Sequence, residues 1–113
     1  MKIVETNTGR NIIEDIDNEK ELLIQRILIN PRTDYEEIYE FHFQRGEEYA
    51  KLTITRTEYG EKISWTQYMD AKEYDALIQQ AKKIASTQNP IDKEAKISHF
   101  ASYVFDKYYK PDP

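Results

Sequence analysis

Histidines and carboxylates are the side chains of this 113-residue chain that could perform acid–base or metal chemistry. The two histidines, His42 and His99, have no sequence neighbour at metal-ligand spacing, such as HxxxH or HExxH. The acidic residues Glu14, Asp15 and Asp17 lack the Asp-x-Asp-x-Asp-Gly spacing of a calcium loop. The sequence therefore predicts no metal site, and these groups are interpreted as solvated surface residues.

Motifs for nucleophilic catalysis and for phosphate binding are also missing from the sequence. It contains no cysteine and no G-x-S-x-G motif. Its three glycines, Gly9, Gly46 and Gly60, are isolated, so neither G-x-G-x-x-G nor a P-loop can be formed. The sequence therefore predicts a protein that is not an enzyme and that uses no cofactor.

The segment DYEEIYE, residues 34–40, is the first candidate binding site. Tyrosine offers contact area at low entropic cost, and acidic side chains attract basic partners. This pattern favours a small, acidic, non-enzymatic protein-binding module, such as an inhibitor, an immunity-type protein or an accessory factor, with a basic partner. The alternative is a charged edge strand that resists aggregation. The candidate residues are Asp34, Tyr35, Glu36, Glu37 and Glu40.

A second candidate is the polar side of the predicted sheet. Aromatic and basic side chains on a sheet can stack bases and contact phosphates, which is typical of proteins that bind single-stranded nucleic acids. The net charge of −5 opposes this function, because an acidic chain repels phosphate groups. The residues of this alternative site are His42, Tyr49, Lys51, Lys62 and Tyr68.

The stretch that positions both sites, residues 39–65, alternates large apolar and polar residues and is interrupted at Gly46 and Gly60. Two-residue turns at these glycines predict a β-meander in which Phe41 lies opposite Ala50 and Ile54 lies opposite Trp65. They also place Glu40 opposite Lys51 on the solvated side. One face of the ribbon then collects the apolar side chains Tyr39, Phe41, Phe43, Ala50, Leu52, Ile54, Ile63 and Trp65.

The stretch ELLIQRILIN, residues 21–30, has apolar residues on every side of both a helix and a strand. Its isoleucines favour a strand, and a helix remains the alternative. Before it, residues 2–16 are compatible with a hairpin that turns near Gly9.

After residue 70 the apolar spacing changes from every second residue to a helical period. Asp70 is suited to cap a first helix, and Asn89 followed by Pro90 is suited to begin a second one. The apolar stripes are Tyr74, Leu77, Ile78, Ala81, Ile84 and Ala85 on the first helix, and Ile97, Phe100, Ala101, Val104, Phe105 and Tyr108 on the second.

These elements predict one α+β domain spanning residues 1–113. Its antiparallel meander has about four strands, with an N-terminal hairpin as a further element, and two amphipathic C-terminal helices pack on one face. The stretch YVFDKYYK, residues 103–110, has more aromatic surface than one helical face can bury. This surplus suggests a homodimer formed through the last helix.

The location of the protein is predicted from what the sequence lacks. No run of ~18 apolar residues and no signal-peptide pattern is present, so no membrane association is expected. Together with the absence of cysteine, this predicts a cytoplasmic protein.

Overall fold

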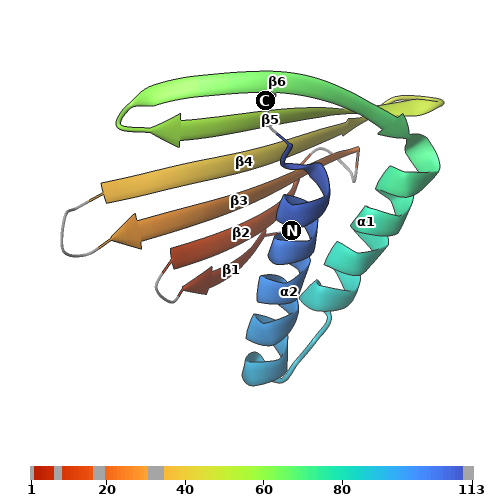
Figure 1. Ribbon diagram of the computed structural model, residues 1–113. Helices are drawn as coiled ribbons and strands as arrows, with labels where there is room; N and C mark the ends of the chain where they lie inside the picture. Colours follow the sequence, from red (N-terminus) through yellow and green to blue (C-terminus); the bar gives the residue numbers. More distant parts are fainter. Residues whose placement is uncertain (1, 7–8, 17–19, 31–34, 111–113) are drawn as a thin grey trace.

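The chain forms one antiparallel sheet of six strands followed by two helices (Figure 1). This computed structural model describes residues 2–6, 9–16, 20–30 and 35–110, and the side chains of residues 20–28 and 36–110 within them. Strand order in the sheet follows the order in the chain. The elements are β1 (Lys2–Thr6), β2 (Gly9–Ile16), β3 (Glu21–Asn30), β4 (Tyr35–Arg45), β5 (Tyr49–Glu58), β6 (Glu61–Asp70), α1 (Ala71–Ala85) and α2 (Pro90–Tyr108).

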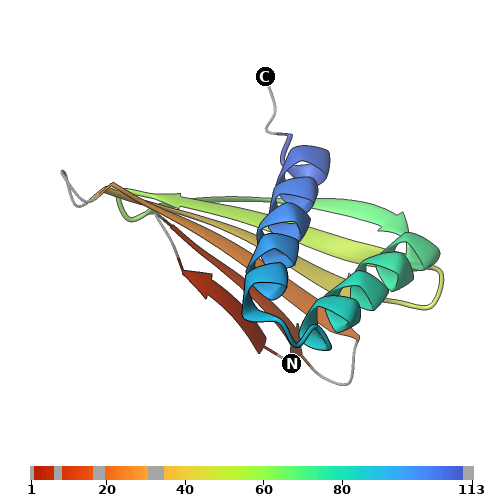
Figure 2. The ribbon, with the colours of Figure 1, turned by 90° about the horizontal axis from the view of Figure 1, so that it is seen from below.

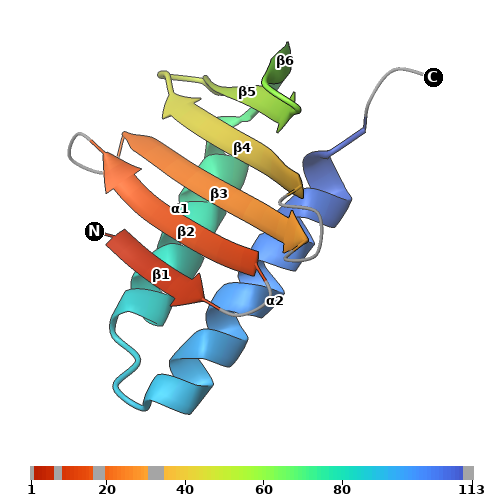
Figure 3. The same cartoon turned by 90° about the vertical axis from the view of Figure 1, so that its left-hand side faces the viewer.

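Both helices lie on the same face of the sheet (Figures 1 and 3). We call this the helix face and the opposite one the open face. The predicted α+β arrangement is confirmed, and so is the interpretation of residues 21–30 as a strand. The expected N-terminal hairpin is present as β1 paired with β2. Its turn, residues 7–8, and the C-terminal residues 111–113 lie outside the described residues.

The β4–β5 hairpin has a longer connection than the predicted two-residue turn. Phe41 pairs with Ile54, not with Ala50, and Glu40 pairs with Thr55, not with Lys51, so the predicted register was wrong. Gly46 explains the difference, because its N–H donates to the Tyr49 carbonyl at 2.8 Å and closes a wider loop. A Cβ at position 46 would lie 2.8 Å from that oxygen, which leaves room only for glycine.

The β5–β6 hairpin has the predicted two-residue turn, and Ile54 pairs with Trp65 as expected. Tyr59 and Gly60 occupy the turn with φ of 52° and 78°. Two consecutive positive φ angles are typical of a type I′ turn, whose twist matches that of the flanking strands.

The core lies between the helix face and the two helical stripes. Phe43, Leu52 and Ile54 from the strands are fully buried, as is Tyr74 from α1. The Phe43 ring meets the Tyr108 ring of α2 edge-on, with centroids 5.6 Å apart. Alternate strand residues therefore share one core with both helices, as the apolar pattern predicts.

Two residues depart from the simple division between a buried and an exposed face. Ile63, expected in the core, is 59% exposed because the β5–β6 hairpin extends beyond the helices (Figures 1 and 2). Ile27 pairs with Ile38 of the open face and is only 4% exposed, although it lies outside the main core cluster. Among the side chains that the structure describes, Ile27 is thus the buried apolar residue of the open face.

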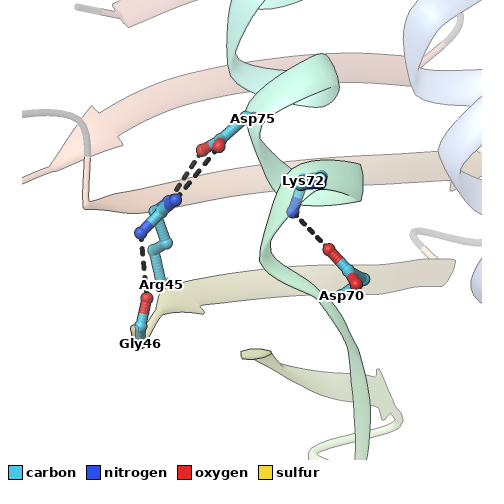
Figure 4. Close-up of polar contacts among 5 residues, drawn as sticks. All are labelled: Arg45, Gly46, Asp70, Lys72 and Asp75. Atoms are coloured by element: carbon cyan, nitrogen blue, oxygen red, sulfur yellow. Dashed lines mark hydrogen bonds and ion pairs between the residues drawn. The ribbon is translucent and has the colours of Figure 1, made fainter. Parts of the chain in front are cut away.

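The helices begin at the predicted caps. The Asp70 carboxylate accepts a hydrogen bond from the Lys72 backbone N–H at 2.8 Å (Figure 4). The Asn89 side chain accepts from the N–H groups of Ile91 and Asp92, and Pro90 occupies the first turn. These contacts satisfy backbone donors that a helix N-terminus leaves without intrahelical partners.

Replacing Phe43 by alanine tests this core. Phe43→Ala should lower the free energy of unfolding by about 3–5 kcal/mol, because it removes a fully buried ring and leaves a cavity. Urea unfolding followed by circular dichroism measures the change. Thr53→Ala, on the open face of β5, is the matched control and should cost about 1 kcal/mol or less. Equal losses in both variants would contradict the assignment of faces.

Candidate functional site

A concave surface lies between α1 and α2, with a cavity volume of about 510 Å³. Residues 86–89 connect the two helices, which diverge from this connection across the sheet (Figure 2). Side chains spaced three and four residues apart along each helix line the groove. We call this feature the helix groove.

The floor of the helix groove is apolar and its walls are polar. Leu77, Ile84 and Phe100 form the floor and are nearly buried. Lys83, Lys96 and His99 stand exposed on the walls. An apolar floor with a charged rim is a common form of binding site for an amphipathic partner.

The carboxylate in the lining, Glu73, is engaged by a lysine of the same groove. Lys107 Nζ lies 2.7 Å from Glu73 Oε1 and donates to the Tyr103 hydroxyl at 3.2 Å. The hydrogen bonds that Lys107 donates to Glu73 and Tyr103 raise the pKa of Lys107. Lys83 and Lys96 therefore leave the groove with an excess of positive charge.

The acidic segment identified in the sequence is divided between the two faces of β4. Glu36 and Glu40 are on the open face, whereas Glu37 is on the helix face. Asp34 lies outside the described residues, and so does the side chain of Tyr35. The strand therefore does not bring the described carboxylates of this segment together into one patch.

Glu37 and Glu40 are also engaged within the chain. Glu37 accepts a hydrogen bond of 2.6 Å from the Tyr39 hydroxyl and forms an ion pair with Arg56 at 3.3 Å. Glu40 accepts a hydrogen bond from the Gln25 side chain at 3.0 Å. Neither carboxylate is free to attract a basic partner without giving up these contacts.

Tyr39, which donates to Glu37, belongs to a cluster of aromatic rings at one end of the core. Tyr39 meets Phe105 edge-on at 5.0 Å, and Tyr109 stacks on Phe105 at 4.8 Å. Tyr109 also lies 5.6 Å from the Trp65 ring. This packing covers, within the chain itself, much of the aromatic surface of residues 103–110 that was expected to contact a second subunit.

The structure brings together most of the residues of the alternative nucleic-acid site. Lys51 pairs with Tyr68, and Tyr49 lies diagonally beside them. The two tyrosines are 62% and 70% exposed. Lys62 pairs with Thr57 and lies on β6 six residues from Tyr68, about 20 Å away.

His42 lies on the open face beside this cluster, where its Nε2 is 3.0 Å from Glu21 Oε1. His99 lies in the helix groove on the opposite side of the sheet, so the two histidines cannot share one site. In the portion of the chain that the structure describes, no group of three or more potential metal ligands is found.

Sequence reasoning missed the helix groove and the long-range ion pairs, among them one between a strand and a helix. Arg45, at the end of β4, donates two hydrogen bonds to Asp75 of α1, at 2.7 and 3.0 Å (Figure 4). Hydrogen bonds from Arg45 lower the pKa of Asp75. The spacing of three and four residues between Lys96, His99 and Tyr103 was the sequence feature from which the groove could have been found.

The chain matches no protein-family model, and no curated protein or solved structure is significantly similar to it. Neither α1 nor α2 combines the length and the apolar character needed to cross a membrane.

The Tyr39 contacts predict a pH dependence of stability. Burial, and then the hydrogen bond to Glu37, raise the pKa of Tyr39 from 10.0 to about 12. The unfolded chain therefore releases this proton first, and the associated stability is complete below pH 10 and is lost as the pH rises toward 12. Between pH 10 and 12 the ionisation of Tyr39 should lower the free energy of unfolding by an amount on the order of 1–2 kcal/mol.

Tyr39→Phe should remove that contribution, as measured by urea unfolding across this pH range. Tyr49→Phe, at an exposed position, is the control and should behave like the unsubstituted chain. If both variants lose the same free energy as the unsubstituted chain, Tyr39 does not have the raised pKa.

Proposed function

We propose that this chain is a non-enzymatic protein-binding module whose helix groove accepts an amphipathic, acidic helical segment of a partner protein. The observation that carries the proposal is the composition of the groove, with an apolar floor beneath lysines that face solvent. A helix docked there would bury its apolar residues against Leu77, Ile84 and Phe100 and present carboxylates to the walls.

Charge is the reason for proposing an acidic rather than a basic partner. Lys83 and Lys96 line the groove, whereas Glu73 is neutralised by Lys107. The sequence pattern of residues 34–40 suggested a basic partner, but β4 directs Glu37 and Glu40 to opposite faces. Opposite charges on groove and partner would accelerate encounter and favour one orientation of the bound helix.

A binding role also suits the kind of side chains present in the groove. Exposed lysines on flexible stems can adjust to a partner surface, and Tyr103 supplies an aromatic contact at the rim. We propose that this binding takes place in the cytoplasm, on the basis of the cysteine-free sequence.

Fluorescence anisotropy with a labelled helical peptide tests the proposal. The peptide has leucines on one face and flanking glutamates, and a second peptide has lysines in their place. The glutamate peptide should bind more tightly, and added salt should weaken its binding. The double variant Lys83→Glu/Lys96→Glu should raise Kd at least ~10-fold.

The matched control is Lys93→Glu/Lys110→Glu, which changes the net charge equally but lies outside the groove lining. It should leave Kd close to that of the unsubstituted chain. Equal binding of the two peptides, or equal effects of the two double variants, would reject the groove as the binding site.

A second candidate, binding of single-stranded nucleic acid, is favoured by the cluster of Tyr49, Lys51 and Tyr68. Two exposed rings beside a lysine on adjacent strands could stack bases and contact phosphate. Glu21, Glu36 and Glu40 lie on the same face and oppose the approach of phosphates. We therefore rank this function below protein binding.

Titration of labelled oligothymidine at low salt tests the second candidate. Tyr68→Ala should weaken binding by about 1–3 kcal/mol if a base stacks on this ring. Tyr59→Ala removes another exposed ring, at the β5–β6 turn, and should have no effect. The absence of any binding at low salt would eliminate this function.

A further inference from the structure

Strand β6 forms one edge of the sheet and pairs only with β5 among the described strands. It is ten residues long and contains no proline. A long edge strand presents unpaired backbone donors and acceptors along its outer side, which is a template for pairing with another strand. Most of its side chains are exposed, so the edge is accessible.

The two-residue turn determines which backbone groups of β6 point outward. Glu58 and Glu61 close the turn as a hydrogen-bonded pair, so the odd-numbered residues of β6 bond to β5. The even-numbered residues then direct their N–H and C=O groups away from the sheet. These outward residues are Lys62, Ser64, Thr66, Tyr68 and Asp70.

We propose that a second copy of this chain pairs with that edge. The two β6 strands run antiparallel, with Thr66 facing Thr66 of the second copy across a two-fold axis. Lys62 of each copy then lies opposite Asp70 of the other, and the two sheets join into one continuous sheet. This interface is separate from the helix groove and does not depend on the proposed function.

The charges of Lys62 and Asp70 favour this register over one shifted by a residue. With Thr66 on the axis, two Lys62–Asp70 pairs form, one at each end of the interface. With Trp65 on the axis, Lys62 would face Tyr68 and Glu61 would face Met69, so no opposite charges meet. Lys62 and Asp70 are each four residues from Thr66, and this symmetry is what an antiparallel pairing of identical strands requires.

The same register covers apolar side chains that a single chain leaves exposed. Ile63, 59% exposed on the helix face, would lie opposite Met69 of the second copy. Tyr68, 70% exposed on the open face, would lie opposite Ser64. The last helix is less suited to this role, since Tyr109 already packs against Phe105 and Trp65.

Sedimentation equilibrium tests whether the dimer exists. At a chain concentration of ~100 μM the mass should be twice the 13.5 kDa of one chain. Lys62→Glu places like charges opposite each other and should raise the dissociation constant at least ~10-fold. Lys51→Glu makes the same change on β5, inside the sheet, and should leave the dimer intact. A single-chain mass for the unsubstituted protein would overturn the proposal.

A cross-link tests the register. Facing Thr66 residues in a hydrogen-bonded pair would have Cα atoms ~5.5 Å apart, within the range that a disulfide spans. The chain has no cysteine of its own, so Thr66→Cys introduces a single thiol. Under mild oxidation it should form a covalent dimer, whereas Thr53→Cys on β5 should not. A dimer in solution that Thr66→Cys does not cross-link would overturn the β6 pairing.

Discussion

Burial of one face of the sheet beneath two helices is the constraint on which the rest of the structure depends. Alternate residues of β3, β4 and β5 share a single core with α1 and α2. Because the side-chain period of a strand is two, every strand that contributes to this core presents its other residues on the open face. The exposure of Tyr49 and Tyr68 on the open face thus follows from the burial of Ala50 and Met69, their neighbours on the helix face.

The distribution of charge follows the same division into layers. Residues 1–70 contain nine Lys and Arg against fifteen Asp and Glu, whereas residues 71–110 contain seven Lys against five Asp and Glu. The helix layer is therefore the positive part of an acidic protein. Different surfaces of one small protein can attract partners of opposite charge, and the net charge does not reveal this.

Much of the fold could be predicted from the sequence because an error in strand register by an even number of residues leaves every side chain on its predicted face. The predicted β4–β5 pairing placed Phe41 opposite Ala50, whereas Phe41 pairs with Ile54. A shift of that kind moves pairs along the strands without changing faces, so the residues of β4 and β5 expected in the core are buried even though their predicted partners were wrong. Helix caps were predictable because Asp70 and Asn89 act on backbone groups a few residues away.

Predictions failed where the outcome depended on distant parts of the chain. Ile63 has the spacing of a core residue, but no helix extends over its end of the hairpin. Glu37 and Arg56 are nineteen residues apart, and only the pairing of β4 with β5 brings them together. The helix groove depends on the angle between α1 and α2, which apolar stripes alone do not specify.

The order of the strands has a consequence for how the chain reaches its native state. Each strand pairs with its immediate successor, from β1 to β6. The entropy lost on closing each successive loop is small, so hairpins can add to one another without long searches for remote segments. Folding of this sheet should therefore be fast for a β-rich architecture. Docking of the helices is the step that brings α2, near the C-terminus, against β1 and β2 at the N-terminus.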